Sequence, residues 1–229
     1  MRLRPIAPAD FDWFADRGAA ADLRRIVASA SQYDGVEPLN EEATLALRHE
    51  GLRGASLWLA EDAGFALVQD ELLNLVVDPV SRGRGVATAL LNNVVNARDT
   101  SLHAWSHVDH PAAGALARAY DFDRVRDLWV MGRALAPGSS GSAALRTFEA
   151  DNLAAIVRIN ARAFAWHPEQ GHLTEADFQR RMGESWFDPS GLIVALVDGE
   201  IAGFHWTKIH PDQIGEVYVV AVDPDFSGR

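Results

Sequence analysis

The fold is decided by the stretch Glu71-Leu-Leu-Asn-Leu-Val-Val-Asp-Pro-Val-Ser-Arg-Gly-Arg-Gly-Val-Ala-Thr-Ala-Leu-Leu91. It begins with an apolar run typical of a buried strand, and Pro79 ends that strand because proline cannot donate to a central ladder. A helix is predicted from about Val86. The segment between them, 82–85, has small residues that let backbone N–H groups approach a ligand, and the helix N-terminus adds partial positive charge. The stretch therefore predicts an anion-binding loop between a strand and a helix.

Two better-known phosphate loops do not fit this stretch. A Walker loop ends in Gly-Lys-Ser/Thr and a Rossmann fingerprint has three spaced glycines, and neither pattern is present. Arg82, Gly85 and Ala87 instead form Arg-x-x-Gly-x-Ala after a strand that ends in Val-Val-Asp-Pro. This string resembles the pyrophosphate loop of the GCN5-related N-acetyltransferases (GNAT), which bind acetyl-coenzyme A (acetyl-CoA). The plainer alternative is an ordinary glycine-rich turn.

Composition narrows the class of protein. A length of 229 residues with 48% hydrophobic content predicts one or two packed domains. The formal net charge of -11 argues against a nucleic-acid partner, so an anionic cofactor needs local positive groups such as Arg82 and Arg84. There are no cysteines, which excludes disulfides, thiolate metal sites and a cysteine nucleophile.

No segment of the sequence indicates a signal peptide or a membrane span, so we expect a soluble, cytoplasmic monomer without a membrane partner. Three histidines, His103, His107 and His110, recur at loose spacing without a convincing carboxylate partner. We therefore expect no metal site.

The rest of the first half alternates between amphipathic and apolar segments. Helices are expected at 10–30 (one or two), 41–49 and 111–119. Strands are expected at 56–60, 64–68, 101–105 and 127–134, the first two joined as a hairpin. This order predicts an α/β layer sandwich with a mixed central sheet and flanking helices.

A second copy of the deciding stretch closes the chain. Residues 216–229 align with 71–84 without a gap, at an offset of 145 positions, with the leading Glu, Asp-Pro and Gly-Arg in common. A helix at 151–164 and strands at 191–197 and 201–205 repeat the elements that precede the first copy.

The repeat and the segment between its copies predict the domain organisation. Residues 136–144 are small and polar, which favours a linker. We therefore expect two tandem GNAT-like domains, at 1–135 and 145–229. Because the second copy stops within its loop, we expect the second domain and its cofactor site to be incomplete, and the parent protein to have about 300 residues.

Acetyl transfer to an amine needs a base, a polarised thioester carbonyl and a proton for the leaving thiolate. Glu71 and Glu216 each begin the strand that would present the acetyl group. Polar and aromatic residues cluster only near Glu216, at 205–210, at Tyr218 and in the loop 164–171. We therefore predict catalysis in the second half, with Glu71 as a structural or rim acid.

Four motifs of the second half carry a narrower resemblance. Segments 167–171, 181–189, 203–211 and 215–224 together resemble the mycothiol synthase family of tandem acetyltransferases. The resemblance covers essentially the whole chain. It implies acetyl transfer from acetyl-CoA to the cysteinyl amine of 1D-myo-inositol 2-(L-cysteinylamino)-2-deoxy-glucopyranoside, the last step of mycothiol biosynthesis.

The same resemblance implies the roles of individual residues. Glu216 is the general base, and Glu41, Glu169 and Lys208 join it in contacting the sugar–inositol substrate. Acetyl-CoA is expected in both domains, at Leu75, Val76, Val77, Gly83, Arg84, Gly85, Val86, Ala87, Thr88, Val220, Ala221 and Val222. Ser227 departs from the family, which usually has Gln or Arg there.

Alternatives remain open for both residues and function. Lys208 can be a solvated turn lysine, and one of His205 and Trp206 is expected in the core. The chain can be a tandem acetyltransferase for another amine, such as an aminoglycoside or a protein N-terminus. It can also be a non-catalytic fragment that binds acetyl-CoA.

Overall fold

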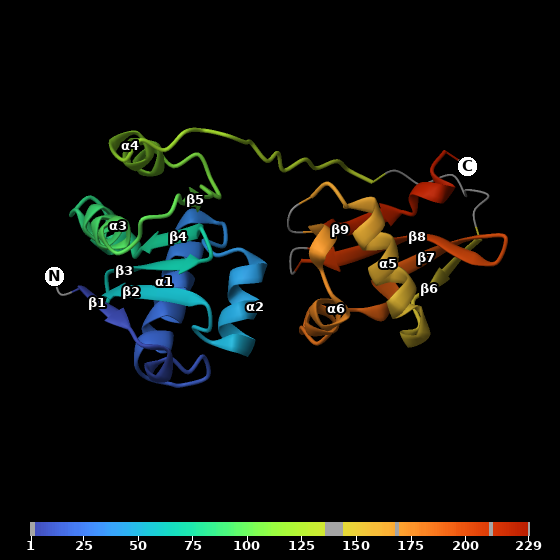
Figure 1. Cartoon of the computed structure of the whole chain (residues 1–229), viewed down its shortest axis with the longest axis horizontal. Coiled ribbons are helices and arrows are strands. Elements are labelled where there is room, and N and C mark those ends of the chain that lie inside the picture. Colours follow the sequence, from blue (N-terminus) through green and yellow to red (C-terminus); the bar gives the residue numbers. More distant parts are fainter. Residues whose placement is uncertain (1–2, 136–143, 168–169, 211–212, 229) are drawn as a thin grey trace. The chain divides into compact units, whose positions relative to one another are not determined.

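The computed structural model describes residues 3–135, 144–167, 170–210 and 213–228. The chain divides into two compact units, Met1–Trp129 and Val130–Arg229, and each is described by itself (Figure 1). The linker predicted at 136–144 lies outside the described residues except for Ala144, which begins a strand.

The first unit contains a five-stranded mixed sheet in the order β1-β2-β3-β4-β5. Its strands are β1 (Leu3–Ile6), β2 (Ala55–Ala60), β3 (Gly64–Gln69), β4 (Leu72–Val77) and β5 (His103–Ala104). Neighbours from β1 to β4 are antiparallel, whereas β5 runs parallel to β4. The predicted mixed sheet and the predicted hairpin are confirmed.

Helices cover both faces of this sheet (Figure 1). They are α1 (Ala19–Asp34), α2 (Glu41–Glu50), α3 (Val86–Asn96) and α4 (Pro111–Ala119). Strand side chains alternate between faces, so Leu57 packs in the cluster with α1 and α2, and Trp58 packs with α3. Each fully buried leucine contributes roughly 1.5–3 kcal/mol, which holds both helical layers on the sheet.

Two elements predicted in the first half of the chain differ from the structure. The region 10–30 forms a short 3-10 turn, Pro8–Asp10, and then α1, because the Asp12 carboxylate accepts from the Phe14 N–H and bends the chain. The strand predicted at 127–134 is wrong: these residues form no strand and their apolar side chains are exposed. An apolar run becomes a strand only where a sheet edge pairs with it, and the edge strand β5 has two residues.

The second unit repeats this plan with a four-stranded antiparallel sheet, in the order β6-β7-β8-β9. Its strands are β6 (Ala144–Thr147), β7 (Leu192–Val197), β8 (Glu200–Ile209) and β9 (Gly215–Val222). Two helices, α5 (Leu153–Ala163) and α6 (Glu175–Met182), contribute Ile156, Ile159 and Phe178 to a core around Trp206. The helix and strands predicted before the second copy are confirmed.

One close approach recurs in both units and ties the repeat to the fold. A Cβ placed on Gly64 would lie 2.7 Å from the carbonyl oxygen of Val76, and one on Gly203 would lie 2.7 Å from that of Ala221. Gly64 lies on β3 and Gly203 lies on β8, and each of these strands pairs with the strand that is followed by Asp-Pro. Only glycine allows this contact without displacing the neighbouring backbone.

Candidate active site

The predicted anion loop of the first unit lies between β4 and α3. After a 3-10 turn at Pro79–Ser81, Gly83 and Gly85 adopt φ of 70° and 78°, and α3 begins at Val86 without a side-chain cap. The first N–H groups of an α-helix have no partner within the helix, and in α3 no cap side chain binds them. A Cβ on either glycine would meet nothing within 4 Å, so the mouth of the loop has room for a ligand. Donors and space together fit a diphosphate at the predicted residues 83–88.

Arg82 makes a different contact from the one expected of it. Its Nη1 and Nη2 donate to the two carboxylate oxygens of Asp34, both at 2.7 Å, and its Nε donates to the Val77 carbonyl at 3.2 Å. The hydrogen bond from Arg82 lowers the pKa of Asp34. Arg82 thus ties the loop to the end of α1, while Arg84 is exposed and has no partner among the described residues.

A buried aspartate follows the deciding strand in both units. Asp78 caps the next turn through the Val80 N–H at 3.2 Å and accepts from Arg25 Nη1 at 3.0 Å. Asp223 caps its own turn in the same way, and Arg162 Nη1 lies 2.8 Å from its Oδ1. In each unit an arginine of the first long helix therefore fastens the point where the strand turns into the loop.

The strands that precede the loops both expose a backbone edge. β5 pairs only with Leu72 and Leu73, so among the described residues 75–77 have no strand neighbour on that side. In the described part of the second sheet, β9 is the outer strand, which leaves 220–222 with an unpaired edge as well. Free N–H and C=O groups are therefore available at both sets of residues predicted to hold acetyl-CoA through their backbone.

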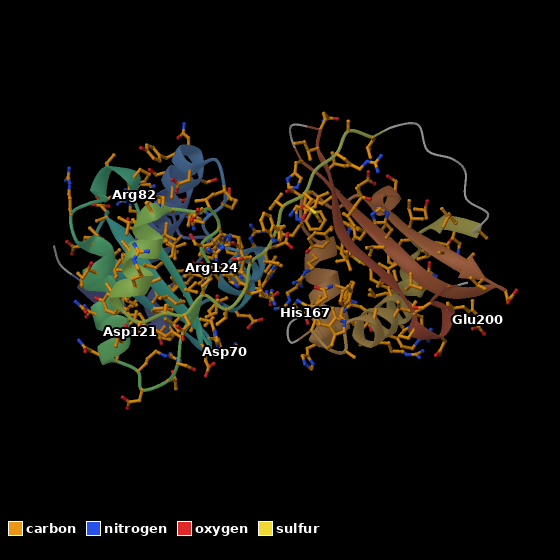
Figure 2. All side chains as sticks on the ribbon, turned by 90° about the horizontal axis from the view of Figure 1, so that it is seen from above. Asp70, Arg82, Asp121, Arg124, His167 and Glu200 are labelled. Carbon is orange, nitrogen blue, oxygen red and sulfur yellow. The ribbon has the colours of Figure 1, made fainter. Side chains whose placement is uncertain are left out.

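A pocket of about 350 Å³ opens beside β9. It is lined by Phe164, His167, Gln170, Val217, Tyr218, Val219 and Val220. His167 is labelled in Figure 2 and follows α5, where its backbone N–H donates to the Phe164 carbonyl. The pocket thus joins the predicted polar loop after α5 to the predicted cofactor strand.

An irregularity in β9 distinguishes the second unit from the first. Trp206 pairs with Val219 and the next residue of β8, Thr207, pairs with Val217, so Tyr218 is an extra residue in the ladder. The equivalent ladder between β3 and β4 has no register shift. Bulges re-aim side chains and are common beside active sites. This difference favours the second unit as the site of chemistry.

Glu216 and Lys208, two of the predicted substrate residues, lie opposite each other on β9 and β8. The Glu216 Oε2 atom is 2.8 Å from His210 Nε2. The Lys208 ammonium lies over the rings of Trp186 and Tyr218, at 4.4 Å and 5.5 Å from their centroids. The structure thus brings a carboxylate, an imidazole, a cation and two aromatic rings together.

Sequence analysis did not single out two members of this cluster, Trp186 and Arg181. Arg181 is buried and its Nε donates to the Tyr218 hydroxyl at 3.1 Å. Both residues lie in the motif 181–189, so that motif is the sequence signal that could have pointed to them. Their individual contacts depend on how α6 and the loop after it pack on the sheet.

The remaining predicted substrate residues lie in the other unit or outside the described residues. Glu41 begins α2 in the first unit, and Glu169 lies outside the described residues. One of His205 and Trp206 was expected in the core, and Trp206 is fully buried there. Glu71 lies 3.7 Å from His103, beyond hydrogen-bond distance.

Two further properties follow from the part of the chain that the structure describes. It contains no cluster of three or more His, Cys, Asp or Glu arranged to hold a metal ion. None of its helices is both long and apolar enough to cross a membrane.

The sequence of this chain matches those of known proteins. Residues 153–229 match the acetyltransferase (GNAT) family. A mycothiol acetyltransferase from Nocardioides sp. is 44% identical, over 92% of this chain and 80% of the relative. One from Actinosynnema mirum is 41% identical, over 96% of this chain and 82% of the relative.

Solved structures share the fold at low sequence identity. A GCN5-related N-acetyltransferase from Sphaerobacter thermophilus aligns with a TM-score of 0.59 at 22% identity, over 100% of this chain and 78% of that one. A GNAT-family acetyltransferase from Colwellia psychrerythraea aligns with a TM-score of 0.54 at 13% identity, over 100% and 80%. The predicted tandem GNAT-like fold is confirmed.

Proposed function

Because the chain belongs to the mycothiol acetyltransferase family, we propose that it acetylates the cysteinyl amine of 1D-myo-inositol 2-(L-cysteinylamino)-2-deoxy-glucopyranoside, the last step of mycothiol biosynthesis. Acetyl-CoA is the proposed acetyl donor. The observation that carries the proposal for this chain is the position of Glu216. This residue lies at the start of β9, a bulged edge strand that lines a pocket. A base, an open backbone edge and a pocket are what transfer of an acyl group to an amine requires.

The proposed base is Glu216, and its geometry suits that role. One carboxylate oxygen, Oε2, contacts His210, while Oε1 has no partner among the described residues and can accept a proton. The α-amine of a cysteinyl group has a pKa of roughly 8, so it loses its proton more readily than a lysine amine. A carboxylate within hydrogen-bond reach of that amine is therefore a sufficient acceptor.

Substrate and donor are proposed to be held by different surfaces. Lys208 and Glu216 contact the sugar–inositol part, together with Glu41 and Glu169. Carboxylates accept hydrogen bonds from hydroxyl groups, which suits an uncharged polyhydroxyl substrate. The donor lies along the open edge of β9 at 220–222, where backbone N–H groups can polarise a thioester carbonyl.

A second molecule of donor is proposed in the first unit. Its pyrophosphate lies at residues 83–88 and its thioester arm runs along 75–77. Support comes from the uncapped N-terminus of α3 and from the open space at Gly83 and Gly85. The first unit lacks the bulge and the close His–Glu contact, so we propose that it binds the donor without catalysis.

Mass spectrometry tests the reaction directly. The protein is incubated with acetyl-CoA and the cysteinyl pseudodisaccharide, and the free thiol is alkylated before analysis so that only acetylation of the amine is scored. We expect one acetyl group on the amine, and none when the amine is blocked beforehand. An aminoglycoside and a peptide N-terminus serve as competing amines.

Each other outcome selects another function. Acetylation of a competing amine alone would indicate a tandem acetyltransferase with a different substrate. Absence of product from every amine, together with calorimetric binding of acetyl-CoA, would indicate a non-catalytic binding protein.

A further inference from the structure

Glu216 needs a partner that holds it in place. Its side chain is 48% exposed, and an exposed glutamate samples several rotamers. Ordering such a side chain costs rotamer entropy. A general base must nevertheless lie within hydrogen-bond reach of the proton that it accepts. Some neighbour must therefore restrict the carboxylate before the substrate arrives.

His210 is the neighbour placed to do this. Its Nε2 lies 2.8 Å from Oε2 of Glu216, a hydrogen-bond distance, and no other described residue contacts that carboxylate through a hydrogen bond or ion pair. In the first unit the corresponding acid, Glu71, is 3.7 Å from the nearest imidazole, that of His103, which comes from β5. A close His–Glu contact is therefore specific to the second unit.

The backbone of His210 is itself fixed by the hairpin between β8 and β9. Its N–H donates to the Ile214 carbonyl at 2.9 Å, and its carbonyl accepts from the Gln213 N–H at 2.9 Å. These bonds close the hairpin that ends beside Glu216. The imidazole is thus attached to a fixed point of the backbone, six positions before the acid that it contacts.

Among the described residues, Lys208 is a further charged group beside this pair. It is the cross-strand neighbour of Glu216, but its ammonium lies over the ring of Trp186. The His210 imidazole contacts Oε2 of Glu216, and Oε1 remains available to the substrate.

We propose that His210 is the positioning residue of the general base: in the tautomer with a proton on Nε2, it donates to Oε2 of Glu216 and leaves Oε1 directed at the substrate amine. The inference rests on the proposed acetyl transfer. His210 does not touch the amine and acts only through the carboxylate. A glutamine at position 210 supplies a similar N–H donor, whereas an alanine supplies none.

Steady-state kinetics of His210→Ala and His210→Gln test the role. We expect kcat of His210→Ala to fall about 10- to 100-fold, because a misplaced catalytic group loses up to about 100-fold. KM for acetyl-CoA should stay within about twofold in both variants, since the proposed donor contacts lie elsewhere. His210→Gln should recover kcat to within about fivefold of the unsubstituted protein. Unchanged kcat in His210→Ala, or equal losses in both variants, would overturn the proposal.

A control and a second readout separate this inference from the proposed function. His103→Ala removes the more distant imidazole of the first unit and should leave kcat unchanged. Nitrogen NMR of the histidine rings reports the tautomer of His210 whether or not the protein turns over this substrate. We expect Nε2–H in the unsubstituted protein and a mixture of tautomers in Glu216→Ala. A tautomer of His210 that is insensitive to Glu216 would refute the hydrogen bond, while inactivity with an intact Nε2–H signal would count against the proposed reaction alone.

Discussion

The clasp between Asp78 and Arg25 offers a quantitative test of how the strand-to-loop junction is held. Replacing Asp78 with alanine removes two contacts of one buried carboxylate, the turn cap to the Val80 N–H and the ion pair to Arg25. Loss of a cap costs about 1 kcal/mol. A surface ion pair contributes up to about 1 kcal/mol and breaking a fully buried one costs about 3–5 kcal/mol. Since the Arg25 side chain is 46% exposed, we assign the pair about 1–2 kcal/mol.

The expected loss for Asp78→Ala is therefore about 2–3 kcal/mol in the free energy of unfolding of the first unit. Asp62→Asn is the matched control, because Asp62 pairs with the same Arg25 at 3.2 Å but its side chain is 83% exposed, and asparagine tolerates the φ of 54° at this position. That substitution should cost less than about 0.5 kcal/mol.

Hydrogen exchange measured by mass spectrometry resolves the two units, because peptides from α1 and β4 report on the first unit alone. Urea unfolding of the whole chain supplies the overall free energy. The affinity for acetyl-CoA, measured by calorimetry, should fall in Asp78→Ala because the proposed loop loses its anchor. Equal stability of the Asp78 and Asp62 variants would refute the reasoning.

Four further substitutions test other parts of the structure. Gly203→Ala places a Cβ 2.7 Å from a backbone oxygen of β9 and should lower stability by about 1–3 kcal/mol in thermal melts. Gly114→Ala, in an exposed helix, should raise stability by about 0.5–1 kcal/mol. If Gly203→Ala were the more stable of the two variants, the close contact would be contradicted. The lowered pKa of Asp34 means that its pair with Arg82 stabilises the fold above the ordinary aspartate pKa of about 3.9 and that this contribution is lost as the pH falls below it. Asp34→Asn should therefore weaken the pH dependence of unfolding below about pH 4, and an unaltered profile would argue against the pair. Glu216→Gln should depress kcat at least about 100-fold with little change in acetyl-CoA affinity, and unchanged turnover would remove Glu216 as the base.

Local signals account for the parts of the fold that sequence analysis predicted correctly. Pro79 ends β4, glycines with positive φ open the loop, and the helix at Pro111–Ala119 begins with a proline in its first turn. Each of these signals depends on the backbone preferences of a few adjacent residues. The gapless repeat of the deciding stretch then indicated two similar units.

Sequence alone determined that this chain contains two acetyltransferase-like units and that Glu216 begins the second deciding strand. Only the tertiary structure decided which side chains meet there. The contact of Arg82 with Asp34 joins residues 48 positions apart, and the bulge at Tyr218 appears only in the pairing of β8 with β9. The apolar run at 127–134 forms no strand, because no neighbouring strand among the described residues pairs with it. Pairing depends on the partner that packing supplies, and the local pattern of residues does not specify that partner.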